Sequence, residues 1–278
     1  MAAISLLQWT SRANWAENKE ILDALLNEAA QARHQDEAQL VVLPEMFARF
    51  GAGEKAQGHF AEPEGSGEVQ DWLASACRRF NLWILAGTLP LQAGERYAAA
   101  SLLFNADGAI HARYDKIHLF DADVEDGTKS YRESKYTRPG QALKVVDTPF
   151  GKLGLAVCYD LRFPEQFRAL CGMGAELIAL PSAFTEVTGR AHWQPLLQAR
   201  AIENQVYMLA PNQCGTHDDG RQTWGHSMVV DPWGRVLVEQ QQTTGVMTVR
   251  PDLDALKAVR TRMPVQQHNQ FEVRFIHD

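Results

Sequence analysis

The sequence lacks the features that mark membrane-spanning and nucleic-acid-binding proteins. No apolar run approaches the ~20 residues that a bilayer-spanning helix needs, and basic residues are not clustered anywhere in the chain. With 27 Lys and Arg against 34 Asp and Glu, the formal net charge is −7. An acidic chain without a basic stretch argues against nucleic acid or an anionic membrane surface as the main partner.

Disulfide frameworks and secretory signals are missing as well. The chain has only four cysteines, and neither a CxxC pair nor zinc-site spacing relates them. The N-terminal segment MAAISLLQWT has no basic region and only a short apolar stretch, unlike a secretory signal. We therefore expect a cytoplasmic protein with free thiols.

Motifs of cofactor and metal sites are also absent. Neither GxxxxGK nor GxGxxG occurs, so no phosphate-binding loop is expected. The acidic residues within 121–126 lack the full spacing of a calcium loop, and no two histidines are spaced as a helical zinc pair. We expect no cofactor and no metal, with His118 and His226 making hydrogen bonds instead.

Short β-type runs alternate with helical patterns along the 278 residues, and no linker or repeat is present. Apolar strands are expected near 2–8, 40–43, 82–87, 153–158, 177–180 and 206–210, and helices near 14–33, 69–80, 164–173, 192–204 and after 252. Turn residues at 106–108 and 231–234 predict two β-hairpins. Hairpins require antiparallel pairs, so stacked mixed sheets covered by helices fit better than a doubly wound parallel sheet. We expect one α/β domain over 1–278, with an extended tail at 264–278.

Three reactive side chains follow predicted strands. Cys158 ends an apolar strand just before a helix that starts near Pro164, where backbone N–H groups are free to face a developing negative charge. Glu45 follows the strand at 40–43, and Lys116 follows the first hairpin. Taken singly, each has a common explanation: an inert buried thiol, a solvated loop glutamate or a solvated lysine. Together they lie at strand ends, where α/β folds gather their sites.

A thiol, a carboxylate and an ammonium form a complete set for attack on an amide or nitrile carbon. The carboxylate takes the thiol proton, the thiolate attacks, and the ammonium stabilises the oxyanion. These residues therefore predict hydrolysis of a carbon–nitrogen bond.

The segments LPEMF, YDKIHLFD and GLAVCYDLRFPE contain Glu45, Lys116 and Cys158. With them, the sequence resembles the nitrilase, or carbon–nitrogen hydrolase, superfamily over about residues 2–262. The resemblance implies a four-layer α-β-β-α sandwich that forms a homodimer or a higher homo-oligomer. It also implies a fourth functional residue, a glutamate that positions the lysine, and Glu133 in YRESK matches it. We expect the oxyanion to be bound by Lys116 and the backbone N–H of Tyr159.

The segments at 118–134, 181–193 and 225–234 resemble amidases that act on deaminated glutathione, with ω-amidases nearby. Such an enzyme forms a cysteine thioester and releases 2-oxoglutarate and cysteinylglycine. A substrate with a carboxylate and a ketone needs a cation and hydroxyl donors, so Arg162, Thr188 and Phe184 are candidate contacts. The alternatives are a structural ion pair for Arg162, a helix cap for Thr188 and core packing for Phe184.

The sequence is compatible with other functions as well. An ω-amidase would act on α-ketoglutaramate or other small amides, and a true nitrilase or N-carbamoyl hydrolase would use the same residues. A catalytically silent interaction protein of the same fold is the alternative outside enzymology. In every enzymatic alternative the partner is a small molecule rather than nucleic acid or membrane.

Overall fold

A computed structural model describes residues 2–276 and centres on two six-stranded sheets. The first sheet contains, in spatial order, β16 (Gly245–Val249), β1 (Ala3–Gln8), β2 (Gln39–Val42), β3 (Trp83–Ala93), β4 (Arg96–Phe104) and β5 (Ile110–Asp115). The second contains β15 (Val236–Gln240), β14 (Ser227–Val230), β11 (Tyr207–Ala210), β10 (Leu177–Ala179), β9 (Gly151–Leu155) and β8 (Val145–Thr148). Each sheet has three parallel strands in its middle, β1–β2–β3 and β9–β10–β11, and antiparallel strands at its edges.

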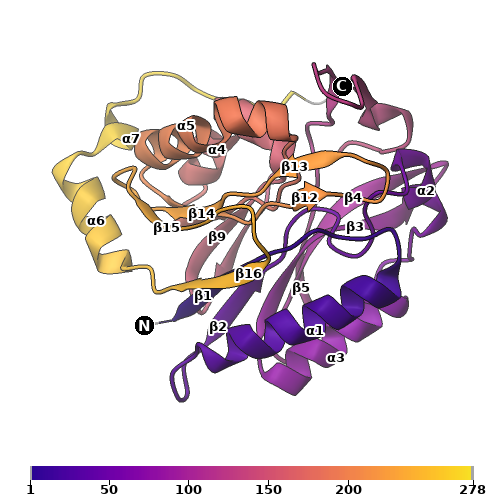
Figure 1. Cartoon of the computed structure of the whole chain (residues 1–278). Coiled ribbons are helices and arrows are strands. Elements are labelled where there is room, and N and C mark those ends of the chain that lie inside the picture. Colours follow the sequence, from indigo (N-terminus) through magenta and orange to yellow (C-terminus); the bar gives the residue numbers. More distant parts are fainter. Residues whose placement is uncertain (1, 277–278) are drawn as a thin grey trace.

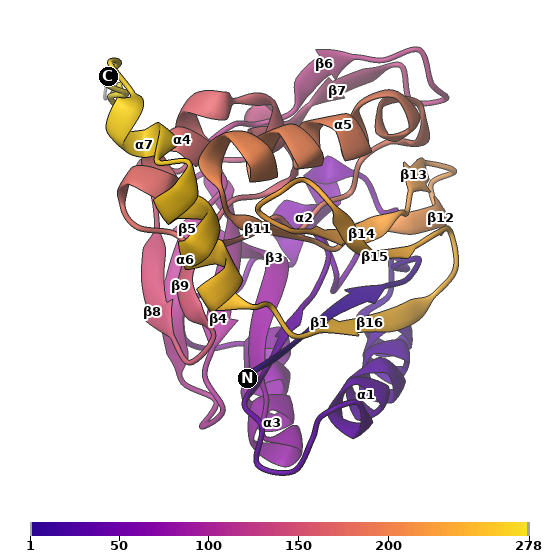
Figure 2. The same cartoon turned by 90° about the vertical axis from the view of Figure 1, so that its left-hand side faces the viewer.

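Helices cover the outer face of each sheet: α1 (Trp15–Gln31) and α3 (Glu68–Phe80) cover the first, and α4 (Pro164–Gly172) and α5 (Glu186–Asn204) cover the second. The other helices are α2 (Glu54–His59), α6 (Leu253–Arg262), whose Leu256 packs into the layer between the sheets, and α7 (Val265–His268). The α1 and α3 helices lie on one side of the strands, and α4 and α5 lie on the opposite side (Figures 1 and 2). Within 2–276, none of these helices is both long and apolar enough to cross a bilayer.

Three layers of buried apolar side chains fill the spaces between these four layers of structure. One lies between the first sheet and α1 and α3, one between the two sheets, and one between the second sheet and α4 and α5. In β2, Val41 belongs to the outer layer, whereas Leu40 and Val42 belong to the layer between the sheets. This division follows because successive strand side chains point to opposite faces. The expected α-β-β-α sandwich is confirmed.

Two small hairpins and two 3₁₀ turns complete the structure around the strand ends. The hairpins pair β6 (Asp121–Asp123) with β7 (Ser130–Arg132), and β12 (Cys214–Thr216) with β13 (Gln222–Trp224). The 3₁₀ turns span Glu133–Lys135 and Cys158–Arg162. The expected strand at 153–158 therefore ends early, since β9 stops at Leu155 and Cys158 starts a turn.

Two further expectations need correction. Helix α5 begins at Glu186 rather than near 192, because the Thr185 side chain accepts a hydrogen bond from the Thr188 N–H and caps the helix. The tail at 264–278 is not wholly extended, because α7 forms directly after Pro264, whose φ of −79° suits a helix start. Residues 269–276 contain no helix or strand, and 277–278 lie outside the described residues.

Candidate active site

Both sheets contribute to one site at the ends of their strands. Glu45 follows β2 and Lys116 follows β5, both in the first sheet, whereas Cys158 follows β9 in the second. Glu133 reaches the same place from the 3₁₀ turn after β7. All four side chains line one cavity of ≈ 490 Å³, which we call the reaction cavity. The structure thus brings together the four residues that the sequence proposed as catalytic.

The Lys116 ammonium lies between two carboxylates. Its Nζ is 2.8 Å from Glu45 Oε1 and 2.9 Å from Glu133 Oε2. All three side chains are largely buried: Lys116 is 2% exposed, Glu45 7% and Glu133 14%. Burial alone would lower the pKa of Lys116, but Glu133 and Glu45 outweigh it and hold that pKa well above its usual value. Lys116 therefore carries a positive charge at neutral pH.

Glu133 is held in place by a second contact besides the one with Lys116. Its Oε2 also accepts a 2.6 Å hydrogen bond from the backbone N–H of Phe120. Burial raises the pKa of Glu133, while the nearby Lys116 ammonium acts in the opposite direction. Because its oxygens are engaged by Lys116 and Phe120, this carboxylate is placed to orient the lysine.

Cys158 sits in a strained turn beside the reaction cavity. Its φ is +46°, in the left-handed region that non-glycine residues seldom occupy outside functional sites. Its N–H donates to the Pro181 carbonyl at 3.0 Å, which ties the turn to the end of β10. Of the four cysteines, all within the described chain, only Cys158 is partly exposed; Cys77, Cys171 and Cys214 are buried.

The thiol of Cys158 needs a base. Burial, followed by the charge of Glu45, raises its pKa well above the usual value, although Lys116 acts in the opposite direction. The sulfur is therefore protonated in the resting protein, and Glu45 is the carboxylate placed beside it. Met46, at φ +56°, donates its N–H to Thr88 Oγ1 at 2.9 Å, and Gln213 Nε2 donates to the Glu45 carbonyl at 2.9 Å. These bonds fix the backbone on both sides of the base.

Asp160 links the lysine segment to the cysteine turn, a role the sequence reasoning missed. Its fully buried carboxylate accepts hydrogen bonds from the Tyr114 hydroxyl at 2.7 Å and the Val157 N–H at 2.8 Å. It also accepts from the His118 N–H at 3.1 Å and lies 2.8 Å from His118 Nδ1. Since Tyr114 and His118 flank Lys116 and Val157 precedes Cys158, Asp160 fixes the two segments relative to each other.

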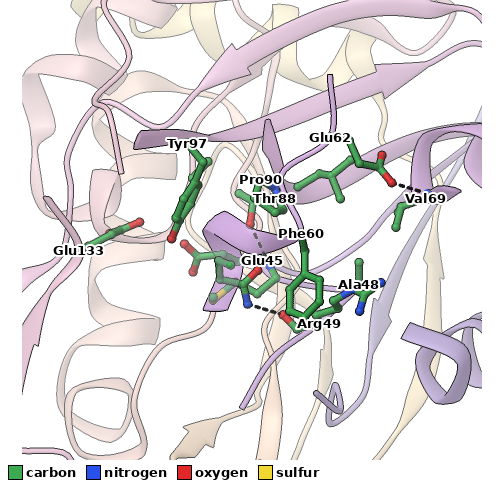
Figure 3. A pocket seen from close by; sticks show the side chains of 14 residues that line it. Glu45, Ala48, Arg49, Phe60, Glu62, Val69, Thr88, Pro90, Tyr97 and Glu133 are labelled. Atoms are coloured by element: carbon green, nitrogen blue, oxygen red, sulfur yellow. Dashed lines mark hydrogen bonds between the residues drawn. The ribbon is translucent and has the colours of Figure 1, made fainter. Parts of the chain in front are cut away.

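Two more cavities adjoin the reaction cavity. A side pocket of ≈ 230 Å³ also contains Cys158 and is lined by Tyr159, Arg162, Phe184 and Thr188. A rear cavity of ≈ 550 Å³ lies behind Glu45 (Figure 3). Figure 3 shows the Glu45, Tyr97 and Glu133 side chains pointing toward one another at its edge.

The candidate substrate contacts all line the side pocket. No ion pair of Arg162 is present within residues 2–276, and its Nη1 is 3.2 Å from His192 Nδ1 instead. Phe184 serves as core as well as wall, because its ring packs 4.8 Å from that of Trp193. Thr188 lies within the first turn of α5 and is not its cap, because Thr185 caps the helix; the two hydroxyls are 2.9 Å apart. The Tyr159 N–H as oxyanion donor stays a prediction.

The sequence reasoning also missed Arg221, which lines the reaction cavity from the turn between β12 and β13. No sequence motif surrounds it, so only the packing of the chain could reveal it. Of the two histidines singled out, His118 bonds to Asp160, whereas His226 lies 2.5 Å from Glu239 and lines none of the three cavities.

Comparisons with known proteins agree with this geometry. The family profile described as carbon–nitrogen hydrolase matches residues 2–261. The deaminated glutathione amidase of Yersinia enterocolitica is 42% identical over 273 residues, covering 97% of this chain and 93% of that protein. The NitFhit protein of C. elegans superposes with a TM-score of 0.90 and 34% identity, covering 100% of this chain and 68% of that one. An amidase of Nesterenkonia sp. AN1, solved with acrylamide added to its active-site cysteine, has a TM-score of 0.76 and 28% identity, covering 96% and 100%.

Proposed function

The chain belongs to the carbon–nitrogen hydrolase family, and we propose that it hydrolyses deaminated glutathione to 2-oxoglutarate and cysteinylglycine. One observation supports a thiol-based amidase above all others. The Lys116 ammonium lies 2.8 Å from Glu45 and 2.9 Å from Glu133, beside the partly exposed Cys158 in one cavity. The similarity to amidases of this name indicates the substrate.

The first half of the reaction forms a thioester. Glu45 takes the proton of the Cys158 thiol, and the sulfur attacks the amide carbon. The oxyanion is stabilised by the Lys116 ammonium and the N–H of Tyr159. The carbon–nitrogen bond then breaks as Glu45 returns the proton to nitrogen, and cysteinylglycine leaves as the amine.

The second half releases the acid. Glu45, now ionised, takes a proton from water, and the resulting hydroxide attacks the thioester carbon. The carbon–sulfur bond breaks, 2-oxoglutarate leaves, and the sulfur regains its proton from Glu45. Glu133 keeps Lys116 in place throughout. Arg162, Thr188 and Phe184 surround the 2-oxoglutarate half, with the guanidinium on its carboxylate.

The test is to trap the thioester. Acid quenching of wild-type protein during turnover of deaminated glutathione stops the second half of the reaction, so we expect a fraction of the chains to have gained the mass of a 2-oxoglutaryl group. Peptide mass spectrometry should locate the adduct on Cys158 and on no other cysteine. A Cys158→Ala control should gain nothing. An adduct on another cysteine, or hydrolysis by Cys158→Ala at the wild-type rate, would refute the mechanism.

A comparison of substrates distinguishes the proposed activity from that of an ω-amidase. We expect wild-type protein to have a higher kcat/KM for deaminated glutathione than for α-ketoglutaramate, simple amides or a nitrile. The reverse order between the first two would make it an ω-amidase.

We also propose a homodimer in the cytoplasm. All four cysteines are free, as the chemistry of Cys158 requires and as a reducing compartment allows.

An exposed apolar surface supports the homodimer. It includes three large side chains that are about half exposed, Ile202, Trp233 and Met263, and Trp233 lines a groove beside α6. Burial of this surface by a second copy would remove it from water. Light scattering should give twice the 31.1 kDa mass of the chain; a mass of one chain would contradict it.

A further inference from the structure

Arg221 is a cation that the proposed mechanism does not use, although it lines the same cavity as Cys158. We propose that Arg221 binds the carboxylate at the amine end of the substrate, and thereby selects amides whose leaving group ends in a carboxylate. This inference rests on the proposed function and adds to it a second anchor, separate from Arg162.

The surroundings of Arg221 leave its guanidinium available to a ligand. Its Nε is buried and has no hydrogen-bond partner within residues 2–276. The nearest carboxylate is that of Asp219, at 3.8 Å, beyond hydrogen-bond distance. A buried N–H without a partner is unfavourable, and a substrate oxygen would satisfy it.

Two aromatic rings hold the guanidinium in place. Its central carbon lies 5.1 Å from the ring centre of Phe50 and 5.2 Å from that of Tyr131, both of which line the reaction cavity. Such contacts stabilise a cation and restrict the rotation of its side chain. A pre-oriented planar fork suits a carboxylate, which can accept two parallel hydrogen bonds from it.

The position of Glu45 indicates which half of the substrate meets Arg221. The proposed mechanism has Glu45 protonate the leaving nitrogen, and Glu45 lines the reaction cavity but not the side pocket. The amine half therefore extends into the reaction cavity, toward Arg221. The acyl half extends into the side pocket, toward Arg162, because the two spaces meet at Cys158.

The length of the leaving group fits this arrangement. Cysteinylglycine has two residues and spans at most ~7 Å from the scissile bond. Its carboxylate must therefore be bound within the cavity that holds Cys158, which Arg221 lines. Arg49 is the other candidate cation, but it lines the rear cavity, stacks 3.9 Å from the Phe60 ring and shares no cavity with Cys158.

This assignment makes Arg221 a determinant of specificity. α-Ketoglutaramate releases ammonia, which has no carboxylate, so its hydrolysis does not depend on Arg221. Deaminated glutathione has a carboxylate at each end and engages both arginines. The reaction cavity would then give deaminated glutathione a higher kcat/KM than α-ketoglutaramate.

The experiment compares Arg221→Gln with wild type on three substrates: deaminated glutathione, the same compound with a C-terminal carboxamide, and α-ketoglutaramate. We expect kcat/KM for deaminated glutathione to fall by roughly 10- to 100-fold, as for a lost hydrogen bond to a charged group, and the other two values to change by less than about twofold. Arg221→Lys should be intermediate, because an ammonium keeps the charge but not the fork.

Arg190→Gln is the matched control, since Arg190 is exposed, pairs with Glu186 and lines neither the reaction cavity nor the side pocket. It should leave all three values unchanged. Equal losses of Arg221→Gln on all three substrates, or no loss on any, would overturn the inference while leaving the proposed function intact. Wild-type protein that hydrolyses α-ketoglutaramate but not deaminated glutathione would instead refute the proposed function, and the inference with it.

Discussion

Lys116 has two distinct electrostatic roles in the active site. It neutralises the facing carboxylates of Glu45 and Glu133, and it provides the positive charge for the oxyanion. Loss of one such donor typically lowers kcat by about 10²–10³-fold. Lys116→Ala should therefore reduce turnover by at least several hundredfold, measured as amine release under saturating substrate.

Lys152→Ala is the control for this prediction, because Lys152 is half exposed and its only ion pair is a 3.9 Å contact with Asp147 among the described residues. Its turnover should equal that of wild type. If Lys116→Ala also kept wild-type turnover, the lysine would not stabilise the oxyanion.

Asp160 acts through other residues rather than on the substrate. It accepts four hydrogen bonds around the segments of Lys116 and Cys158, and an asparagine in its place would present N–H groups to two of those donors. Asp160→Asn should lower kcat by about 10- to 100-fold and stability by ~1–3 kcal/mol. The alkylation rate of Cys158 by iodoacetamide should fall too, which a purely stabilising role would not cause.

Tyr114→Phe serves for comparison, since it removes one of the four donors to Asp160. We expect a smaller loss in kcat than with Asp160→Asn. Equal effects of the two substitutions would mean that the Tyr114 contact alone accounts for the role of Asp160.

At the level of elements, the β12–β13 hairpin carries Arg221 and is anchored by His217. The His217 ring is 2.9 Å from the Ser11 carbonyl, 2.8 Å from Thr223 Oγ1 and 4.1 Å from the Phe50 ring. Burial lowers the pKa of His217 to about 4. The His217 ring is therefore neutral in the folded protein at neutral and mildly acidic pH, whereas in the unfolded chain this ring takes up a proton near pH 6.5.

This difference predicts a pH dependence of stability. As the pH falls from about 6.5 toward 4, the unfolded state takes up a proton that folded His217 does not, so the free energy of unfolding decreases. The decrease is about 2 kcal/mol by pH 5. Urea unfolding at pH 7.5 and pH 5 should show His217→Gln less stable at the higher pH, with the gap to wild type narrowing at the lower one. A gap that is the same at both pH values would contradict the burial of a neutral ring.

The hairpin also shows where prediction from sequence stops. Periodic apolar positions and turn residues predicted stacked mixed sheets covered by helices, because α1, the central strands and α6 follow local rules. The four-layer order came from the resemblance to the family. Glu45, Lys116 and Cys158 were found because each follows a strand or hairpin. Arg221 could not be found this way, since its place depends on α5 packing against β13. At that crossing a Cβ on Gly189 would lie 2.3 Å from Trp224 Cβ, so only glycine permits the approach.

For the whole molecule, the active site depends on how the two sheets face each other. Glu45 and Lys116 extend from one sheet and Cys158 from the other, so the relative placement of the sheets sets the distance between base and nucleophile. The apolar layer between the sheets fixes that placement. A substitution that leaves a cavity in this layer should therefore lower kcat, whereas an equivalent substitution in an outer layer should leave kcat unchanged.

Leu85 and Leu73 allow a matched comparison, because both are fully buried leucines and neither lines the reaction cavity. Leu85 on β3 belongs to the layer between the sheets, and Leu73 on α3 to the layer under the helices. Each leucine-to-alanine change should cost ~2–5 kcal/mol in chemical unfolding. Well below the melting temperature, Leu85→Ala should also lower kcat, while Leu73→Ala should keep it. Equal kcat in the two variants would mean that the packing between the sheets does not set the distance between Glu45 and Cys158.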